Sequence, residues 1–295
     1  MIKHEPIKLI ITDNESVEHE MTQDDIYDLL PDVESFKTTD YYNYSKQETK
    51  DYTLNLSNAM DFFLREKKRM EDDKGYKKAM KAKYDQFSRS GNKIYNQVYS
   101  RIKTSEDVCV YCNLRNRDIA ELDHFFPKAT FPSLAISINN LIPSCSYCNH
   151  PKNDNFPLDY VLLHPYYDNC LDNVYDYLKY KINEFKGYNI VGEFYIDKTE
   201  NMDDYTYIRI IKHFEFFDLN KYYKKDFISD YDEFVETLNN IDCLKEKLEK
   251  KRDYNRKKRS APWLYAGFDA LTHSEDFFRI IENKLCRKEE FMSSQ

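Results

Sequence analysis

The sequence predicts an α+β fold that is mostly helical, with a compact centre between helical N- and C-terminal regions. Residues 58–103 contain no proline and repeat apolar residues every three to four positions, which indicates amphipathic helices; residues 205–259 also lack proline and are helical in pattern. Residues 179–197 alternate apolar and polar residues around "KGYN", which predicts a β-hairpin. The centre is rich in cysteine and proline instead. We therefore expect three segments, at 1–104, 105–165 and 166–295.

Local signals refine these segments. "HEPIKLIIT" near the N terminus predicts a short strand, and Thr22 in "TQDDIYDLL" is placed to cap a short helix. We expect one or two helices within 58–103 and two or three within 205–259. Residues 260–285 begin with Ser and Pro, which marks the start of a further helix.

Charge is unevenly distributed along the chain, whose formal net charge is −8. Residues 1–60 hold 13 acids and 5 lysines, whereas residues 61–104 hold 13 Lys or Arg and 6 acids. A second basic run at 245–259 holds 9 Lys or Arg and 3 acids. Both runs are typical of solvated helix faces, and both also suit contact with nucleic-acid phosphates.

Nothing in the sequence suggests a membrane or secretory protein. The chain has no apolar run of about 18 residues, and its start is too polar and acidic for a secretory signal. We expect a cytoplasmic protein, and in that reducing setting the seven cysteines are more typical of metal ligands or buried thiols than of disulfides.

Two C-x2-C pairs predict a structural zinc site. Each pair directs two thiolates toward one point, and two pairs complete a tetrahedral set. The 32 residues between the pairs exceed the roughly 15–20 of a plain zinc ribbon. The zinc would hold the ends of this insert together, so the insert becomes a closed loop with fixed stems. The four ligands are Cys109, Cys112, Cys145 and Cys148.

Polar residues in and beside the insert suit phosphodiester hydrolysis. That reaction needs a base to deprotonate water, and histidine titrates near neutral pH. It needs a hard cation such as Mg²⁺, which prefers the oxygens of Asp and Asn, and an amide oxygen can fix the imidazole tautomer. A single His beside an acid is more often solvated or packed in a core. Here the segment whose ends the zinc would hold together, with the residue that follows Cys148, supplies the histidine, the acid and the amides: Asp123, His124, Asn140 and Asn149.

The order "CVYC … LDHFFPK … NNLIPSCSYCNHPK" resembles the HNH endonucleases of the ββα-metal, or His-Me finger, superfamily in their four-cysteine zinc form. The likeness covers about 50 of the 295 residues. It implies a zinc-stapled ββα-metal core at the centre of the fold. The longer stretch up to "LHPYYD" is similar to stand-alone HNH proteins of bacterial anti-phage defence.

The resemblance assigns roles by position. His124 matches the general base, and Asn140 matches the residue that orients it. Asp123 and Asn149 match the protein ligands of catalytic Mg²⁺ or Mn²⁺, and Asn149 also counts among the catalytic set. The four cysteines match the structural zinc ligands.

Several neighbouring residues leave alternatives open. His150 follows Asn149 directly, but adjacent helical residues diverge by about 100°, and the register favours Asn149. Pro151 predicts that the helix begins close to Asn149, because proline fits only a first turn. Lys152 suits either a phosphate contact or an exposed surface position. His164 suits packing beneath the site, with a smaller chance of a functional role.

We expect a metal-dependent endonuclease that hydrolyses DNA and, by family likeness, cuts one strand to leave 5′-phosphate and 3′-hydroxyl ends. The alternatives are an RNA-cleaving toxin and a non-catalytic zinc module that binds nucleic acid. The sequence has no P-loop, so an ATPase or sensor partner would be another chain.

Overall fold

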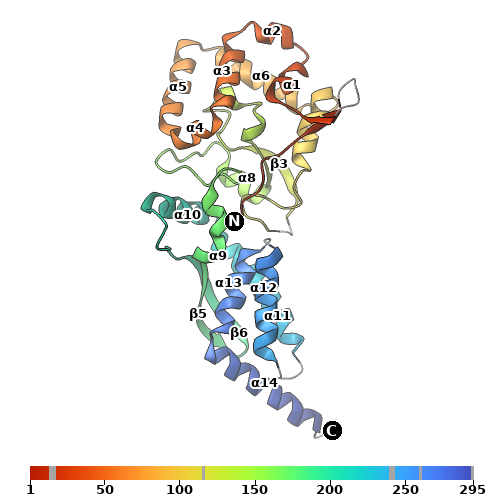
Figure 1. The fold of residues 1–295 in the computed structure, drawn as a ribbon, viewed down its shortest axis with the longest axis vertical. Helices are drawn as coiled ribbons and strands as arrows, with labels where there is room; N and C mark the ends of the chain where they lie inside the picture. Colours follow the sequence, from red (N-terminus) through yellow and green to blue (C-terminus); the bar gives the residue numbers. More distant parts are fainter. Residues whose placement is uncertain (13–17, 115–116, 239–242, 259–260, 294–295) are drawn as a thin grey trace. The chain divides into compact units, whose positions relative to one another are not determined.

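The computed structural model describes residues 1–12, 18–114, 117–238, 243–258 and 261–293 (Figure 1). The chain divides into two compact units, one of residues 3–168 and one of residues 1–2 with 169–295. The expected first and second segments thus pack together in one unit, and the unit boundary follows Asp168. The mostly helical α+β prediction is confirmed.

The first unit begins with a small antiparallel hairpin and a series of helices. Strands β1 (Ile10–Thr12) and β2 (Glu18–Glu20) pair, as the N-terminal strand signal predicts in part. Thr22 caps α1 and forms a capping box with Asp25, which confirms its expected role. The helices that follow are α1 (Gln23–Asp28), α2 (Val33–Lys37), α3 (Asp40–Lys50), α4 (Tyr52–Ser57), α5 (Ala59–Asp72), α6 (Tyr76–Ser88), a π-helical turn (Tyr95–Tyr99) and α7 (Ser100–Lys103).

A ββα element follows these helices. Strand β3 (Ile119–His124) pairs antiparallel with β4 (Leu141–Cys145), and α8 (Ser146–Lys152) follows β4 directly. The loop between the strands contains two short 3₁₀ turns, at Pro132–Leu134 and Ile138–Asn140. This is the ββα arrangement that the resemblance implies.

The start predicted for α8 is wrong. The helix begins at Ser146 and carries Pro151 in its last turn, not its first. Proline lacks an N–H and so cannot bond the carbonyl four residues earlier. Because α8 ends at Lys152, only one helical hydrogen bond is lost, and the short helix tolerates it.

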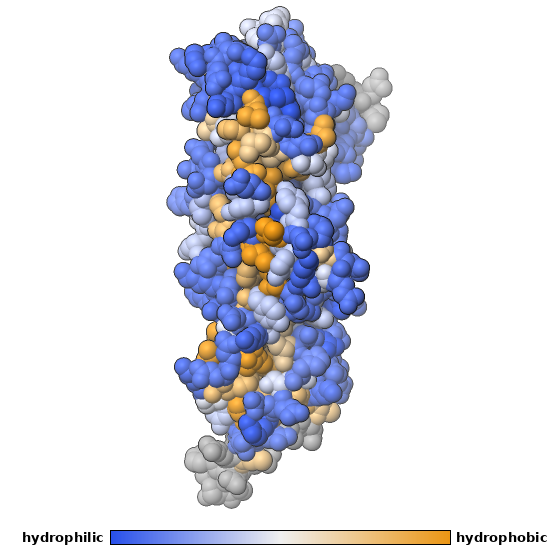
Figure 2. All heavy atoms as spheres, turned by 90° about the vertical axis from the view of Figure 1, so that its left-hand side faces the viewer, coloured by the Kyte–Doolittle hydropathy of each residue, from blue (hydrophilic) through white to orange (hydrophobic). Residues whose placement is uncertain are grey.

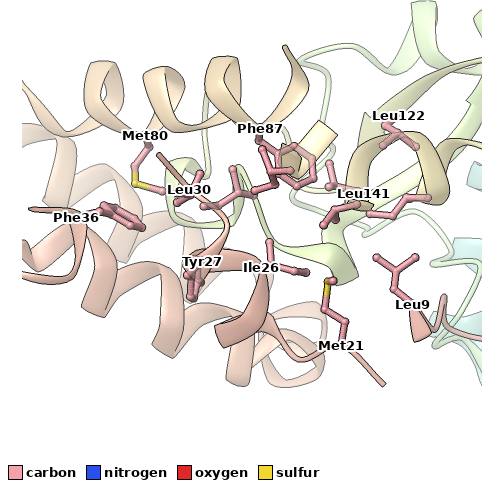
Figure 3. Close-up of a cluster of buried hydrophobic side chains, with 14 of the residues drawn as sticks. Leu9, Met21, Ile26, Tyr27, Leu30, Phe36, Met80, Phe87, Leu122 and Leu141 are labelled. Carbon is pink, nitrogen blue, oxygen red and sulfur yellow. The ribbon is translucent and has the colours of Figure 1, made fainter. Parts of the chain in front are cut away.

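One apolar core joins the helices to the ββα element. Figure 3 shows Leu122 of β3 and Leu141 of β4 in the same cluster as Tyr27 of α1 and Met80 of α6. All four side chains are buried. Since full burial of such a side chain contributes roughly 1.5–3 kcal/mol, the cluster fixes the strands against the N-terminal helices.

The second unit packs a β-hairpin against helices. Strands β5 (Leu178–Lys186) and β6 (Asn189–Ile196) form the predicted hairpin. Gly267 is required where α13 approaches α11, because a Cβ there would lie 2.3 Å from the Phe227 ring. The helices are α9 (Val174–Tyr177), α10 (Asp204–Phe216), α11 (Leu219–Glu236), α12 (Leu244–Lys258), α13 (Pro262–Thr272) and α14 (Glu275–Ser293), after a 3₁₀ turn (Asn169–Asn173).

The stretch at 260–285 contains two helices rather than one; residue 260 itself lies outside the described residues. The break falls after Thr272, and Ser274 accepts a hydrogen bond from the Phe277 N–H at 3.2 Å. A serine side chain that satisfies a free N–H starts a new helix, so the local cap ends one helix and begins the next.

The surface is mainly hydrophilic on the face that Figure 2 shows, with smaller apolar patches between the charged side chains. Within the described ranges, every helix is too short or too polar to cross a membrane.

Candidate active site

The four predicted zinc ligands come together. Cys109 and Cys112 precede β3, Cys145 ends β4 and Cys148 lies in α8. All four are buried, and their sulfur atoms lie within 4.8 Å of one another. Tetrahedral zinc with Zn–S bonds of about 2.3 Å holds sulfurs about 3.8 Å apart, so the cluster fits zinc. Such an ion would join the base of β3, the end of β4 and α8.

The strand register places the acid and the histidine at the far end of the hairpin. Asp123 pairs with Ile142, and His124 pairs with Leu141. Both side chains line a cavity of about 300 Å³, which we call the site cavity. Side chains from α6, β3, the following loop and α8 also line it, among them Tyr84, Glu121, Lys128, Asn149 and Asp154.

Asp123 is a buried carboxylate with two partners. It is 4% exposed; Tyr111 donates its hydroxyl to Oδ2 at 2.7 Å, and the Lys152 ammonium lies 2.8 Å from the same oxygen. Tyr111 stands between two zinc cysteines, so the zinc turn itself positions the carboxylate. Burial raises the pKa of Asp123, and the Lys152 charge opposes that rise. Both recorded contacts use Oδ2, which leaves Oδ1 for a cation.

His124 has one fixed ring nitrogen. Its Nε2 lies 2.9 Å from the Ala135 carbonyl oxygen, so Nε2 carries the proton and Nδ1 carries the lone pair. The Tyr84 ring packs edge-on against the imidazole, with centroids 4.6 Å apart. Burial lowers the pKa of His124 to about 3, and the charges of Lys128 and Lys152 add to the effect. The imidazole is therefore neutral at pH 7, with the Nδ1 lone pair unprotonated.

The direct contact expected between Asn140 and His124 is absent from the described hydrogen bonds. Instead, the Asn140 amide braces the loop from Phe126 to Leu134: Oδ1 accepts from the Phe126 N–H at 2.7 Å, and Nδ2 donates to the carbonyls of Phe126 and Leu134 at 3.0 and 3.1 Å. The backbone carbonyl of Ala135, which accepts from the His124 Nε2–H, fixes the tautomer of the imidazole instead. Asn140 thus acts on His124 through the backbone that it holds, both directly after His124 and in the loop that leads to Ala135.

Asn149 and His150 differ in exposure and direction. Asn149 is half-buried and lines the site cavity, whereas His150 is exposed and does not line it. The Asn149 Nδ2 donates to the Glu121 carboxylate, which leaves the amide oxygen for a cation. These placements agree with the register argument for Asn149.

Lys152 is neither a surface residue nor placed for a phosphate contact. It is 0% exposed, pairs with Asp123 and donates to the His124 carbonyl oxygen. Burial lowers the pKa of Lys152, and the Asp123 charge opposes that fall. A lysine held by two buried oxygens has no free face for substrate.

His164 lies in the core beneath the site. It is fully buried, its ring centroid lies 4.4 Å from that of Phe125, and its Nε2 lies 3.1 Å from the Tyr52 hydroxyl. Tyr52 in turn donates to the Asn140 Oδ1 at 3.2 Å. These contacts agree with a packing role.

The oxygen donors around the site cavity fit a hard cation. Asp123 and Asn149 each offer one oxygen, and few protein ligands suffice because Mg²⁺ keeps several waters and accepts substrate oxygens. Sequence reasoning missed Glu121, which two-residue alternation along β3 places on the face of Asp123. It also missed Lys128 and Tyr84, and for Tyr84 no local sequence signal exists.

Comparison with known proteins identifies the class of this site. Residues 109–155 match the family model of the HNH endonuclease. The chain therefore carries an HNH endonuclease domain that contains the zinc cluster and the site residues.

Two relatives match part of this chain. Septu protein PtuB of Bacillus thuringiensis is 28% identical over 118 residues, which are 38% of this chain and 44% of PtuB. Protein ea31 of Escherichia phage lambda is 34% identical over 92 residues, which are 29% of this chain and 30% of ea31. The matched region spans less than half the length of each relative. No solved structure gives a significant match.

Proposed function

We propose that this protein is a metal-dependent endonuclease that hydrolyses phosphodiester bonds in DNA. The observation that carries the proposal is His124, which is fixed through Nε2 to the Ala135 carbonyl and lies in one cavity with Asp123 and Asn149. A neutral imidazole with a fixed tautomer beside oxygen donors suits water activation next to a bound cation.

The reaction follows from these positions. A water oxygen forms a bond to phosphorus while the bond from phosphorus to the 3′ oxygen breaks. His124 Nδ1 takes the proton of the attacking water, and the departing 3′ oxygen takes a proton from solvent. A cation held by Asp123 and Asn149 would offset negative charge on the phosphate. The products carry 5′-phosphate and 3′-hydroxyl ends.

Helix α12 supports a nucleic-acid substrate. Five of its cations have no carboxylate within 4.0 Å among the described residues: Lys245, Lys247, Arg256, Lys257 and Lys258. In the first basic run, carboxylates pair with six of the 13 Lys and Arg residues: Arg65, Lys67, Lys68, Arg69, Lys81 and Lys83. On α12 three of the cations without a carboxylate partner, Arg256, Lys257 and Lys258, are consecutive. Such a cluster attracts phosphates, so we propose α12 as a backbone-binding surface.

A role in anti-phage defence is supported by the similarity to Septu protein PtuB. We propose that the nuclease works in the cytoplasm with an ATPase or sensor supplied by another chain. A four-cysteine zinc site suits that reducing compartment.

Plasmid cleavage tests the proposal. Purified protein is incubated with supercoiled plasmid, and in parallel with tRNA, in Mg²⁺ or Mn²⁺. We expect plasmid nicking that falls about 10²–10⁴-fold in His124→Ala, the usual contribution of a general base. Asn149→Ala loses activity that added metal restores in part, whereas the adjacent exposed control His150→Ala keeps it.

Other outcomes contradict parts of the proposal. Equal cutting by wild type and His124→Ala contradicts the proposed role of His124 as the general base. Cutting of tRNA alone identifies a ribonuclease instead. Nucleic-acid binding without cleavage under any metal, with or without cell extract, identifies a non-catalytic module.

A further inference from the structure

Lys128 lies at the site without an ion-pair partner among the residues that the structure describes. It follows Pro127 in the loop after β3, is half-buried and lines the site cavity with Asp123 and His124. Among the described residues no carboxylate lies within 4.0 Å of its ammonium, and its one recorded contact is the Tyr84 ring, 4.7 Å from Nζ. An aromatic face steadies a cation without neutralising it.

Lys152, the other lysine near the site, differs from Lys128 in its burial and in its partners. The Lys152 ammonium is fully buried and held by the Asp123 carboxylate and the His124 carbonyl, so its charge is already matched. Lys128 keeps its positive charge toward the cavity. Partial burial lowers the pKa of Lys128, while the charges of Asp154 and Asp123 raise it; an anion in the cavity would stabilise the ammonium further.

The cavity wall presents both signs of charge. Glu121, Asp123 and Asp154 supply carboxylates that attract a cation, and Lys128 supplies the ammonium. A phosphodiester bound through a cation to the carboxylates still carries non-bridging oxygens that need a second positive partner. A lysine serves as such a point charge for phosphate.

We propose that Lys128 is a catalytic residue whose ammonium binds a non-bridging oxygen of the scissile phosphodiester. This inference rests on the proposed function and moves the expected phosphate contact from Lys152 to Lys128. Lys128 forms no covalent bond and transfers no proton. It neutralises the charge that grows on the non-bridging oxygens while the water oxygen bonds to phosphorus and the 3′ oxygen leaves.

Binding of thymidine 3′,5′-bisphosphate in Mg²⁺, measured by calorimetry, tests the site without catalysis. A hydrogen bond to a charged group contributes about 1.5–3 kcal/mol, so Lys128→Met should raise the Kd about 10- to 100-fold. Lys128→Arg keeps the charge and should stay within a few-fold of wild type. The control Lys78→Met removes an exposed lysine of α6 and should bind as wild type, and thermal melting confirms that all variants fold.

Plasmid cleavage by the same variants separates the two proposals. We expect Lys128→Met to lower kcat more than it raises KM, because the charge is largest in the transition state. Wild-type protein that does not bind the bisphosphate, or Lys128→Met that binds and cuts as wild type, overturns the role of Lys128. Lys128-dependent binding without cleavage of any nucleic acid instead overturns the endonuclease and leaves the anion site in place.

Discussion

Asp123 and Lys152 form a fully buried ion pair at the site, with 2.8 Å between carboxylate oxygen and ammonium nitrogen. Each charge is costly in the protein interior by itself, and the pair is tolerated because each partner compensates the other. Tyr111 and the His124 carbonyl supply the remaining hydrogen bonds. Lys152 therefore opposes protonation of the carboxylate and holds it in place.

A double-mutant cycle tests this pairing. Lys152→Met leaves a buried carboxylate without its cation, and we expect it to lower the free energy of unfolding by roughly 3–5 kcal/mol. Asp123→Asn leaves the buried Lys152 ammonium without its anionic partner and should lower the free energy of unfolding by a similar amount. The double variant should lose less than the sum of the two, measured by urea denaturation with zinc present. Strictly additive losses contradict a coupled pair.

At the scale of elements, the four-cysteine cluster joins the parts of the ββα element. Cys109 and Cys112 precede β3, Cys145 ends β4, and Cys148 lies in α8. Tyr111, between the first two ligands, holds Asp123, so the zinc turn and the site are one assembly. Loss of zinc should disturb both.

Metal analysis by mass spectrometry tests the zinc assignment. We expect about one zinc per chain, the stoichiometry of a four-cysteine site, and loss of most of it in Cys148→Ser together with a lower Tm. Cys286→Ser removes an exposed cysteine of α14 and serves as the control. Equal zinc content in both variants contradicts the assignment.

The loop between β3 and β4 is anchored by α5. The carboxylate of Glu66, which is 0% exposed, accepts from the Ser133 N–H at 3.0 Å and pairs with Arg69 at 2.6 Å. Ser133 lies two residues before Ala135, whose carbonyl fixes His124. Through Glu66, α5 thus helps to set the orientation of the base.

Replacement of this anchor should impair the site at a distance. Glu66→Gln removes the charge that Arg69 and the loop share, and we expect kcat for plasmid cleavage to fall by about tenfold, because small displacements at a reacting centre are costly. Assays run well below the Tm of the variant exclude simple unfolding. Glu71→Gln, an exposed change on the same helix, should leave kcat unchanged; an equal effect of both variants contradicts the anchor.

At the scale of the whole molecule, the two units carry different parts of the proposed activity. The unit of residues 3–168 holds the zinc cluster and the site cavity, whereas the unit of residues 169–295 holds α12 with its unpaired cations. On α12 the Lys258 ammonium also lies 4.7 Å from the ring of Tyr254, which is 53% exposed. Such a surface suits a phosphate backbone and sequence-independent affinity.

The salt dependence of DNA binding tests α12. In a His124→Ala background that prevents cleavage, Lys257→Gln with Lys258→Gln should flatten the slope of log K against log salt by about 2, since each lost phosphate contact removes about 0.9. Fluorescence anisotropy on a labelled duplex measures the slope. The matched control changes Lys67 and Lys68, which pair with carboxylates, to Gln. An unchanged slope for the α12 variant excludes this surface.

The sequence by itself determined the features that depend on short spacing. Two C-x2-C pairs predict the cysteine cluster, and the two periodicities predict the hairpin and most helices. These features follow from local geometry, because a C-x2-C turn or an alternating strand directs its side chains without help from distant residues. The ββα element that carries Asp123, His124 and Asn149 is instead implied by the resemblance to HNH endonucleases.

Only the tertiary structure decided how those residues are partnered. It shows that Ala135 rather than Asn140 bonds the His124 ring, and that Lys152 is buried against Asp123, 29 positions earlier in the chain. It also places Lys128 at the cavity beside Tyr84 of α6, with no carboxylate within 4.0 Å among the described residues. A charged side chain is paired or free according to what folding brings within about 4 Å of it, and sequence spacing does not fix that distance.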